Sequence, residues 1–355
     1  MAGKRFISLE ELTSALAKLA GKLNVWIPAL SKEDKTGVEF LPYREGMTPV
    51  LNRQSTLPPK KLLLPQVETL LRFEYRKDSE DPSKSRIHLD ERPNPAGPAL
   101  VFGARPCDVR GFFTFDRVFT GGPFVDGPYR DRRKNTLFAT LVCREADGAC
   151  FCSSVGSGPA DMEGSDLRLT PVQGGLVIEA LKDEALALLD CIGRAPTEQQ
   201  EEEAKRIIDE ASHRRVGELD LEGCAKDFLK RFEDKGYWRE MASQCLSCSI
   251  CTYVCPTCYC FTITDEMKNL RGERLRSWDS CMSCHYTSEA SGHNPRPTKL
   301  ERYRNRVGHK FSYIPEKYEE LIGCCGCGRC IRSCPVAIDI RKVVERLKEE
   351  TCECA

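Results

Sequence analysis

Eight cysteines of the chain form two copies of one motif, C-x2-C-x2-C-x3-C followed by proline. In ferredoxins with two clusters, the three closely spaced cysteines of a motif bind one four-iron cluster, and the fourth cysteine binds the other cluster. A pair of zinc sites is the alternative, but zinc sites usually join two C-x2-C hooks. The motifs therefore predict two crossed 4Fe-4S clusters, one on Cys245, Cys248, Cys251 and Cys334 and the other on Cys324, Cys327, Cys330 and Cys255.

A second group of cysteines follows two predicted strands in the first half of the chain. Cys107 follows the apolar segment PALVFGA, and Cys143 ends the apolar segment TLFATLVC. Because parallel strands end at the same edge of a sheet, both thiols should arrive on one side. Cys150 and Cys152 follow in CFC, where an extended backbone points both side chains the same way. We expect these four thiols to bind a third 4Fe-4S cluster, well separated from the other two; four independent buried cysteines are the alternative.

The elements that must position these cysteines indicate an α/β domain over residues 1–215. Ser8 and Glu11 form a capping box before the helical pattern LEELTSALAKLAGKL, and Pro65 suits the first turn of a second helix, QVETLLRF. The segments on either side of Cys107 read as β-α-β with parallel strands, and DLRLT and GLVIEAL read as further strands. Thr197 and Gln200 cap a charged helix that we expect to be a solvated connector.

Residues 216–355 are predicted to form a mainly α-helical dicluster domain. Helical patterns precede the first cysteine motif and follow the second, and the long segment between the motifs carries helical rather than hairpin signals. Cys325, inside the second motif, is expected to be a small buried side chain. Three charged residues flank Cys107: Arg105, Asp108 and Arg110. They could contact a cluster or a partner protein, and the alternative is that they are ordinary loop charges.

Composition limits the remaining classes of function. The chain has 355 residues and 21 cysteines, and its 53 basic residues balance its 53 acidic residues, so we expect no nucleic-acid partner. No segment is long and apolar enough for a membrane span, and the first residues lack the apolar core of a signal peptide. We therefore expect a cytoplasmic protein with reduced thiols. No phosphate-binding glycine loop is present, so a nicotinamide or flavin site should lie on another chain.

The motifs together resemble a known family, the iron-sulfur beta subunits of cytosolic sulfhydrogenases and the similar A subunit of anaerobic sulfite reductase. The resemblance covers roughly residues 60–345 and is carried by the following stretches: GARPCDVRGFFTFDRVF, LVCREADGACFCSSVGSGP, CLSCSICTYVCPTCYC, RGERLRSWDSC, SGHNPR and CCGCGRCIRSCPVAIDI. It implies an anaerobic electron-transfer subunit between two partners. One partner is a flavin subunit that handles NAD(P)H, and the other is a catalytic subunit of hydrogenase, sulfite reductase or heterodisulfide-reductase type.

The resemblance also implies an additional metal site. Cys258, Cys260, Cys281 and His293 match family positions, and three thiolates with one imidazole suit zinc or an iron-sulfur cluster. Alternatively, the extra sulfurs lie against a neighbouring cubane and tune its potential. Cys284 departs from the family pattern: it creates CMSCH, the form of a c-type haem attachment site, and it is a rival to His293 as the fourth ligand.

Two functions compete on these observations. The first is an electron-transfer subunit without a catalytic centre of its own. The second is a self-contained reductase, which would follow if Cys258, Cys260 and Cys281 held a cluster with only three protein ligands. A redox-responsive regulator is a third class, but no nucleic-acid-binding helix pair or basic patch is evident.

Overall fold

A computed structural model describes residues 3–31, 36–91, 96–144, 146–190, 192–319 and 321–349 of the chain. The amino-terminal half is built on a seven-stranded sheet in the order β1-β9-β8-β7-β6-β2-β3. Its strands are β1 (Lys4–Ser8), β2 (Asn24–Leu30), β3 (Val38–Pro42), β6 (Ala99–Ala104), β7 (Thr136–Leu141), β8 (Leu167–Val172) and β9 (Gly175–Ala180). The pairs β2–β6, β6–β7 and β7–β8 are parallel, and the other pairs are antiparallel. The predicted β-α-β unit around Cys107 is therefore confirmed.

Helices cover both faces of this sheet. Every residue of β6 is buried, because its side chains alternate between two apolar cores. Leu100 and Phe102 pack in the core that contains α1 (Leu9–Ala20), which begins with the predicted Ser8–Glu11 capping box. Val101 packs in the opposite core, which is formed largely by α3 (Pro106–Phe119). The shorter helices of this half are α2 (Lys60–Leu63), α4 (Gly127–Lys134), η1 (Cys152–Val155), η2 (Asp183–Ala185) and α5 (Leu186–Leu189).

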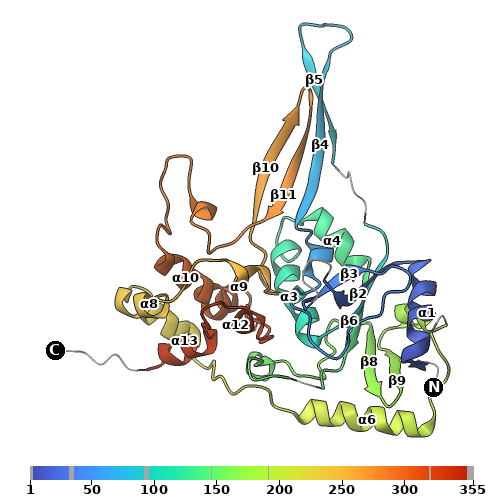
Figure 1. Ribbon diagram of the computed structural model, residues 1–355. Coiled ribbons are helices and arrows are strands. Elements are labelled where there is room, and N and C mark those ends of the chain that lie inside the picture. Colours follow the sequence, from blue (N-terminus) through green and yellow to red (C-terminus); the bar gives the residue numbers. More distant parts are fainter. Residues whose placement is uncertain are drawn as a thin grey trace.

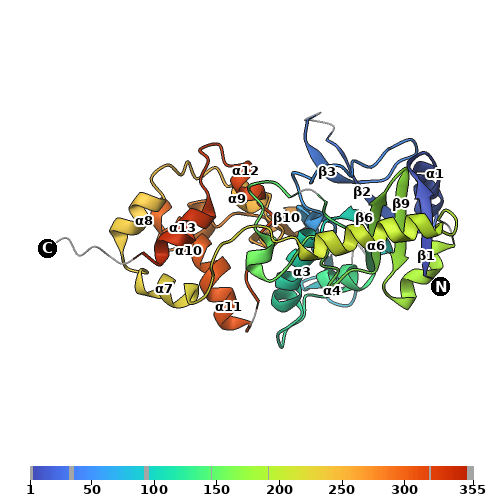
Figure 2. The same cartoon turned by 90° about the horizontal axis from the view of Figure 1, so that it is seen from below.

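The charged helix α6 (Glu198–His213) is more than a connector. Its capping box at Thr197 and Gln200 is present as predicted. However, Ala204, Ile207 and Ala211 are buried against residues of β8, β9 and the segment after β7. Figure 2 shows this helix lying along one face of the amino-terminal half. The expectation of a solvated connector was therefore wrong for one face of the helix.

A second sheet projects from the body of the molecule (Figure 1). It has four antiparallel strands in the order β10-β11-β4-β5, with β4 (Val67–Lys77), β5 (Ser85–Asp90), β10 (Phe261–Lys268) and β11 (Arg271–Trp278). The structure corrects two expectations here. The segment QVETLLRF is largely strand and not helix, and the chain between the two cysteine motifs contains a hairpin, β10–β11.

The carboxyl-terminal region is otherwise helical. Its helices are α7 (Cys224–Lys230), α8 (Lys235–Met241), α9 (Ile250–Tyr253), η3 (His285–Thr287), α10 (Lys299–Gly308), η4 (His309–Tyr313), α11 (Ile314–Lys317), α12 (Arg329–Arg332) and α13 (Ile340–Leu347). Trp238, Phe228 and Val344 are fully buried at the centre of its core. Phe151 and Val155 from the first half also pack in this core, so residues 1–215 and 216–355 share both a sheet and a core. Within the described residues, no helix has the length and apolar character needed to cross a membrane.

Candidate iron-sulfur sites

The two cysteine motifs adopt the same backbone turn. Positive φ angles occur at equivalent positions, Ser247 (55°) and Ser249 (66°) in the first motif and Gly326 (62°) and Gly328 (71°) in the second. In each motif, the amide of the second residue after the first cysteine donates a 3.4 Å hydrogen bond to that cysteine's Sγ. Serine adopts this conformation only where the surroundings enforce it. Each turn thus places an N–H group on sulfur, which stabilises a thiolate.

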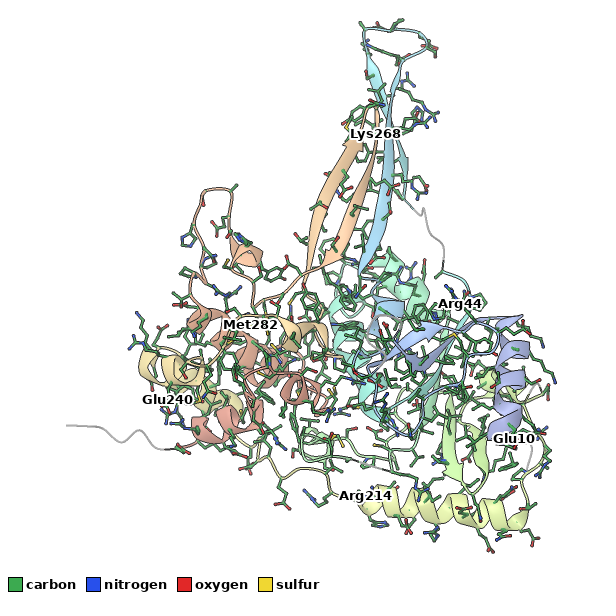
Figure 3. The ribbon with its side chains drawn as sticks, in the orientation of Figure 1. Glu10, Arg44, Arg214, Glu240, Lys268 and Met282 are labelled. Atoms are coloured by element: carbon green, nitrogen blue, oxygen red, sulfur yellow. The ribbon has the colours of Figure 1, made fainter. Side chains whose placement is uncertain are left out.

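The fourth cysteine of the second motif lies with the first motif. One cavity is lined by Cys245, Cys248 and Cys251 together with Cys334, and also by Cys330 and Met282. Met282 is 1% exposed and lies in the carboxyl-terminal region, whereas Lys268, the last residue of β10, lies in the projecting sheet (Figure 3). The amide of Ile338 donates a 3.3 Å hydrogen bond to the Sγ of Cys334. The structure therefore brings together the four cysteines that crossing assigns to the first cluster.

The fourth cysteine of the first motif lies, in turn, with the second. Burial, together with the charges of Cys327, Cys324 and Cys255, raises the pKa of Cys330 to about 12 against the opposing charge of Arg306. Cys255, Cys324 and Cys327 are all buried. The second predicted set is thus also gathered in one place, deep in the molecule.

Buried cations stand beside these thiols. The ammonium of Lys310, on the π-helix η4, donates hydrogen bonds to Cys255 Sγ (3.3 Å), Thr257 Oγ1 (2.9 Å) and the carbonyl of Gly323 (3.0 Å). Burial by itself lowers the pKa of Lys310, but the thiolates of Cys255 and Cys258 hold it well above its ordinary value. A buried cation needs such partners, and anionic clusters supply them. π-Helical turns are frequent at functional sites.

The four amino-terminal thiols are also brought together. Cys107 lies in the first turn of α3 after β6, and Cys143 follows β7 at the same edge of the sheet. Burial is the main cause that raises the pKa of Cys107 and of Cys152. The charge of Cys143 raises both pKa values further, and the charge of Cys150 also raises that of Cys152. One detail differs from expectation: Cys152 begins the short helix η1, so the CFC segment is not extended throughout.

This amino-terminal set is not well separated from the second motif, contrary to expectation. Cys107 packs directly with Cys325 and Cys327 of the second motif. The thiol of Cys150 lies 3.9 Å from the carbonyl oxygen of Cys327. The four thiols lie near the predicted sheet edge, and nothing in the sequence indicates which part of the second half covers that edge.

The charged residues around Cys107 serve the fold. Asp108 caps α3 through the amide of Arg105 (3.0 Å) and forms an ion pair with Arg329 at 2.7 Å, with both charged side chains 1% exposed. Arg329 also donates to the carbonyl of Ser55 at 2.7 Å. Arg105 and Arg110 donate to the carbonyls of Leu51 and Val155. Among these residues, the Asp108–Arg329 pair fastens the amino-terminal half to the second motif.

Cys258, Cys260 and Cys281 line a further cavity of about 250 Å³. Cys281 donates a hydrogen bond that lowers the pKa of Cys260 to about 6. The two predicted fourth ligands are elsewhere: Cys284 and His293 are exposed, and neither lines this cavity. The structure therefore gathers three members of the predicted set and does not bring in a fourth.

The donor chemistry of these sites fits iron-sulfur clusters. Metal binding requires thiolates. A hydrogen bond from Cys258 lowers the pKa of Cys255, and one from Cys325 lowers the pKa of Cys327 to about 7. In a cubane, each thiolate binds a different iron. Among the described residues, no three histidine, cysteine or acidic side chains approach closely enough to share one ion. Cys325 is buried as expected, but it also contributes this hydrogen bond.

Sequence reasoning missed the buried cations. Lys60, Arg306 and Lys310 are each at most 4% exposed. Lys60 donates to the carbonyls of Thr252 and Cys258, both at 3.2 Å. Lys60 is far along the chain from Arg306 and Lys310, and none of the three belongs to a cysteine motif, so no spacing signal could have identified them.

Comparison with known proteins agrees with this arrangement. Residues 244–338 match the family model of the 4Fe-4S dicluster domain. The chain is 29% identical over 304 residues to Sulfhydrogenase 2 subunit beta of Pyrococcus furiosus, which covers 83% of this chain and 84% of that protein. No solved structure matches the chain. The predicted resemblance to the iron-sulfur beta subunits of sulfhydrogenases is thereby confirmed.

Proposed function

We propose that the chain is the electron-transfer iron-sulfur subunit of a cytoplasmic oxidoreductase complex. The observation that carries this proposal is the exchange of fourth cysteines between the two motifs: Cys334 lies with the first motif and Cys255 with the second. That exchange is characteristic of ligation in two-cluster ferredoxins, which are electron carriers. Residues 216–355 would hold these two clusters, and residues 1–215 would supply a third on Cys107, Cys143, Cys150 and Cys152.

The chain's own residues account for what the clusters would require. The thiolates hold the irons, and amide groups of the two turns donate to sulfur. Lys310 places a fixed positive charge between Cys255 and Cys258, which favours the more negative, reduced state of a nearby cluster. The clusters, when bound, supply one-electron chemistry; the protein sets their order, potential and access to solvent.

Two partner subunits follow from this role. The relative is named as a beta subunit, which supports an assembly of several chains. We propose a flavin subunit that handles NAD(P)H on one side and a catalytic redox subunit on the other. The clustering of Cys107 with Cys325 and Cys327 supports a continuous path from the amino-terminal thiols through the second motif to the first.

A count of metal and sulfide tests the proposal. The full chain, purified without oxygen, should contain at least about eight iron atoms and eight sulfides for the two motifs and about four more of each for the amino-terminal set. It should accept electrons from dithionite and should not oxidise NAD(P)H by itself. A chain that binds zinc without sulfide, or one that turns over NAD(P)H at ordinary enzyme rates, would contradict the proposal.

A further inference from the structure

Three thiols line the cavity beside Cys258. Cys258 and Cys260 come directly after the first motif, and Cys281 comes after β11. The cavity has a volume of about 250 Å³, so a small group fits beside the three thiols.

The same cavity also carries positive charge and hydrogen-bond donors, beside the sulfur of Cys258. Arg306 and Lys310 line the cavity and are 3% and 4% exposed. Their nitrogen atoms lie 3.9 Å and 3.7 Å from the Sγ of Cys258. Asn305, 8% exposed, adds a side-chain amide to the same lining. Such a lining attracts an anion and disfavours a cation.

One buried hydroxyl group in this cavity lacks a partner. Thr114, on α3, is 1% exposed, and its Oγ1 makes no hydrogen bond within the described part of the chain. A threonine inside a helix commonly donates to the carbonyl four residues earlier, but Thr114 does not. Because buried polar groups are nearly always satisfied, this hydroxyl points to a missing ligand.

The position of Thr114 is fixed by the helix that carries it. Cys107, Gly111 and Thr114 lie on one face of α3 at helical spacing. A Cβ atom at Gly111 would lie 2.6 Å from the Cβ of Pro256, so α3 presses directly on the turn that leads to Cys258. The same face therefore contacts the amino-terminal thiol set at one end and the three-thiol cavity at the other.

We propose that Cys258, Cys260 and Cys281 hold an iron-sulfur cluster with three protein thiolates, and that its remaining iron binds a small inorganic anion oriented by Thr114, Asn305 and Arg306. This inference rests on the proposed iron-sulfur function and extends it with a ligand-binding centre. Neither of the predicted fourth ligands, Cys284 or His293, lines the cavity; the imidazole of His309 does line it. The cations beside the thiols would offset the charge of both cluster and anion.

Carbon-13 cyanide is a suitable probe, because it is a small anion that binds iron directly. The full chain is purified without oxygen, reduced with dithionite and titrated with the probe, and the hyperfine coupling of carbon-13 to the cluster spin is recorded. We expect a coupling in the unaltered protein that disappears in Cys260→Ala. Thr114→Val removes only the hydroxyl and should raise the cyanide concentration needed for half-saturation about tenfold. Thr170→Val, the same change at a buried position on β8, should leave it unaltered.

The outcomes separate this inference from the proposed function. Spectra with normal signals from the two-motif clusters but no carbon-13 coupling would overturn the anion site alone. A coupling that persists unchanged in Cys260→Ala would also overturn it, because the anion would then bind another cluster. Equal half-saturation in Thr114→Val and unaltered protein would remove Thr114 from the site. Absence of every iron-sulfur signal would overturn both proposals together.

Discussion

The first and second cysteine motifs share their spacing and their backbone turn, yet the protein surrounds them differently. In the first motif, Leu246 is 65% exposed and Ile250 is 36% exposed, and Cys248 is also exposed. The equivalent positions of the second motif, Cys325 and Arg329, are each 1% exposed. The second motif lies beneath the segment Ala149–Cys152, whereas the first lies at the surface.

The covering chain explains the residues that differ between the motifs. At the first left-handed position, the exposed motif has Ser247 and the covered motif has Gly326, where a Cβ atom would lie 2.5 Å from the backbone of Phe151. Ligand spacing thus sets the kind of cluster, and the covering chain decides which cluster a partner can approach. We infer that the first cluster exchanges electrons with a partner subunit and that the second relays them inside the molecule.

Exchanging the residues that precede the third cysteine of each motif, Arg329 and Ile250, should give the largest difference in stability between the two motifs. Arg329→Ile leaves Asp108 buried without its cation, and we expect a loss of about 4 kcal/mol in the free energy of unfolding. The reciprocal change, Ile250→Arg, lies at the surface and should alter it by no more than about 0.5 kcal/mol. Anaerobic guanidinium unfolding of the iron-loaded chain measures both. Equal losses in the two variants would remove the distinction between the motifs.

Substitutions at the first left-handed position of each motif, Gly326 and Ser247, should give the next largest difference in stability. Gly326→Ala combines a left-handed alanine with a clash against Phe151, and we expect a loss of about 3 kcal/mol and release of the Ala149–Cys152 segment. Ser247→Ala retains the same backbone conformation without a clash and should be close to neutral. Proteolysis near residue 150, followed by mass spectrometry, detects the release. A resistant Gly326→Ala protein would show that the segment does not depend on this contact.

The residues after the first cysteines should respond less strongly. Cys325→Leu overfills a buried position between Cys107 and Cys327, which should cost about 2 kcal/mol. Leu246→Cys, the reverse exchange, should change stability by less than about 0.5 kcal/mol because Leu246 is exposed. The midpoints of thermal unfolding of the two iron-loaded variants provide the comparison. A tolerant Cys325→Leu variant would mean that the covered motif is loosely packed.

The smallest effect is expected from Ser249→Gly. Ser249 has a φ of 66° in the first motif, where the second motif has Gly328. Glycine relieves the left-handed strain but adds flexibility to the unfolded chain, so we expect a gain of at most about 1 kcal/mol. The same unfolding measurement detects it. A clear loss of stability would indicate that the Ser249 side chain itself supports the turn.

The sequence was informative where local spacing determines structure. The cysteine motifs predicted which thiols gather, and the apolar segments on either side of Cys107 predicted the parallel pair β6–β7 and its sheet edge. The sequence was uninformative where contacts between distant residues determine the secondary structure. The segment Val67–Lys77 is a strand because it pairs with β11 about two hundred residues later, which no local pattern of helical leucines reveals.

Contacts between the two halves were the other gap. The closeness of Cys107 to Cys327 and the pairing of Asp108 with Arg329 depend on how the halves meet. Neither residue pair has a spacing or composition signal in the chain. The buried lysines beside the thiols were missed for the same reason, since a lysine is recognisable as a cluster neighbour only after the fold is known.

The exchange of fourth cysteines is the central claim, and one set of variants tests it directly. Electron paramagnetic resonance of the reduced chain identifies the first cluster as the signal lost in Cys248→Ser and the second as the signal lost in Cys327→Ser. We predict that Cys334→Ser perturbs the signal that Cys248→Ser removes, although Cys334 belongs to the second motif, and that Cys255→Ser perturbs the other. If Cys334→Ser instead altered only the signal that depends on Cys327, each motif would bind its own cluster and the crossed arrangement would be contradicted.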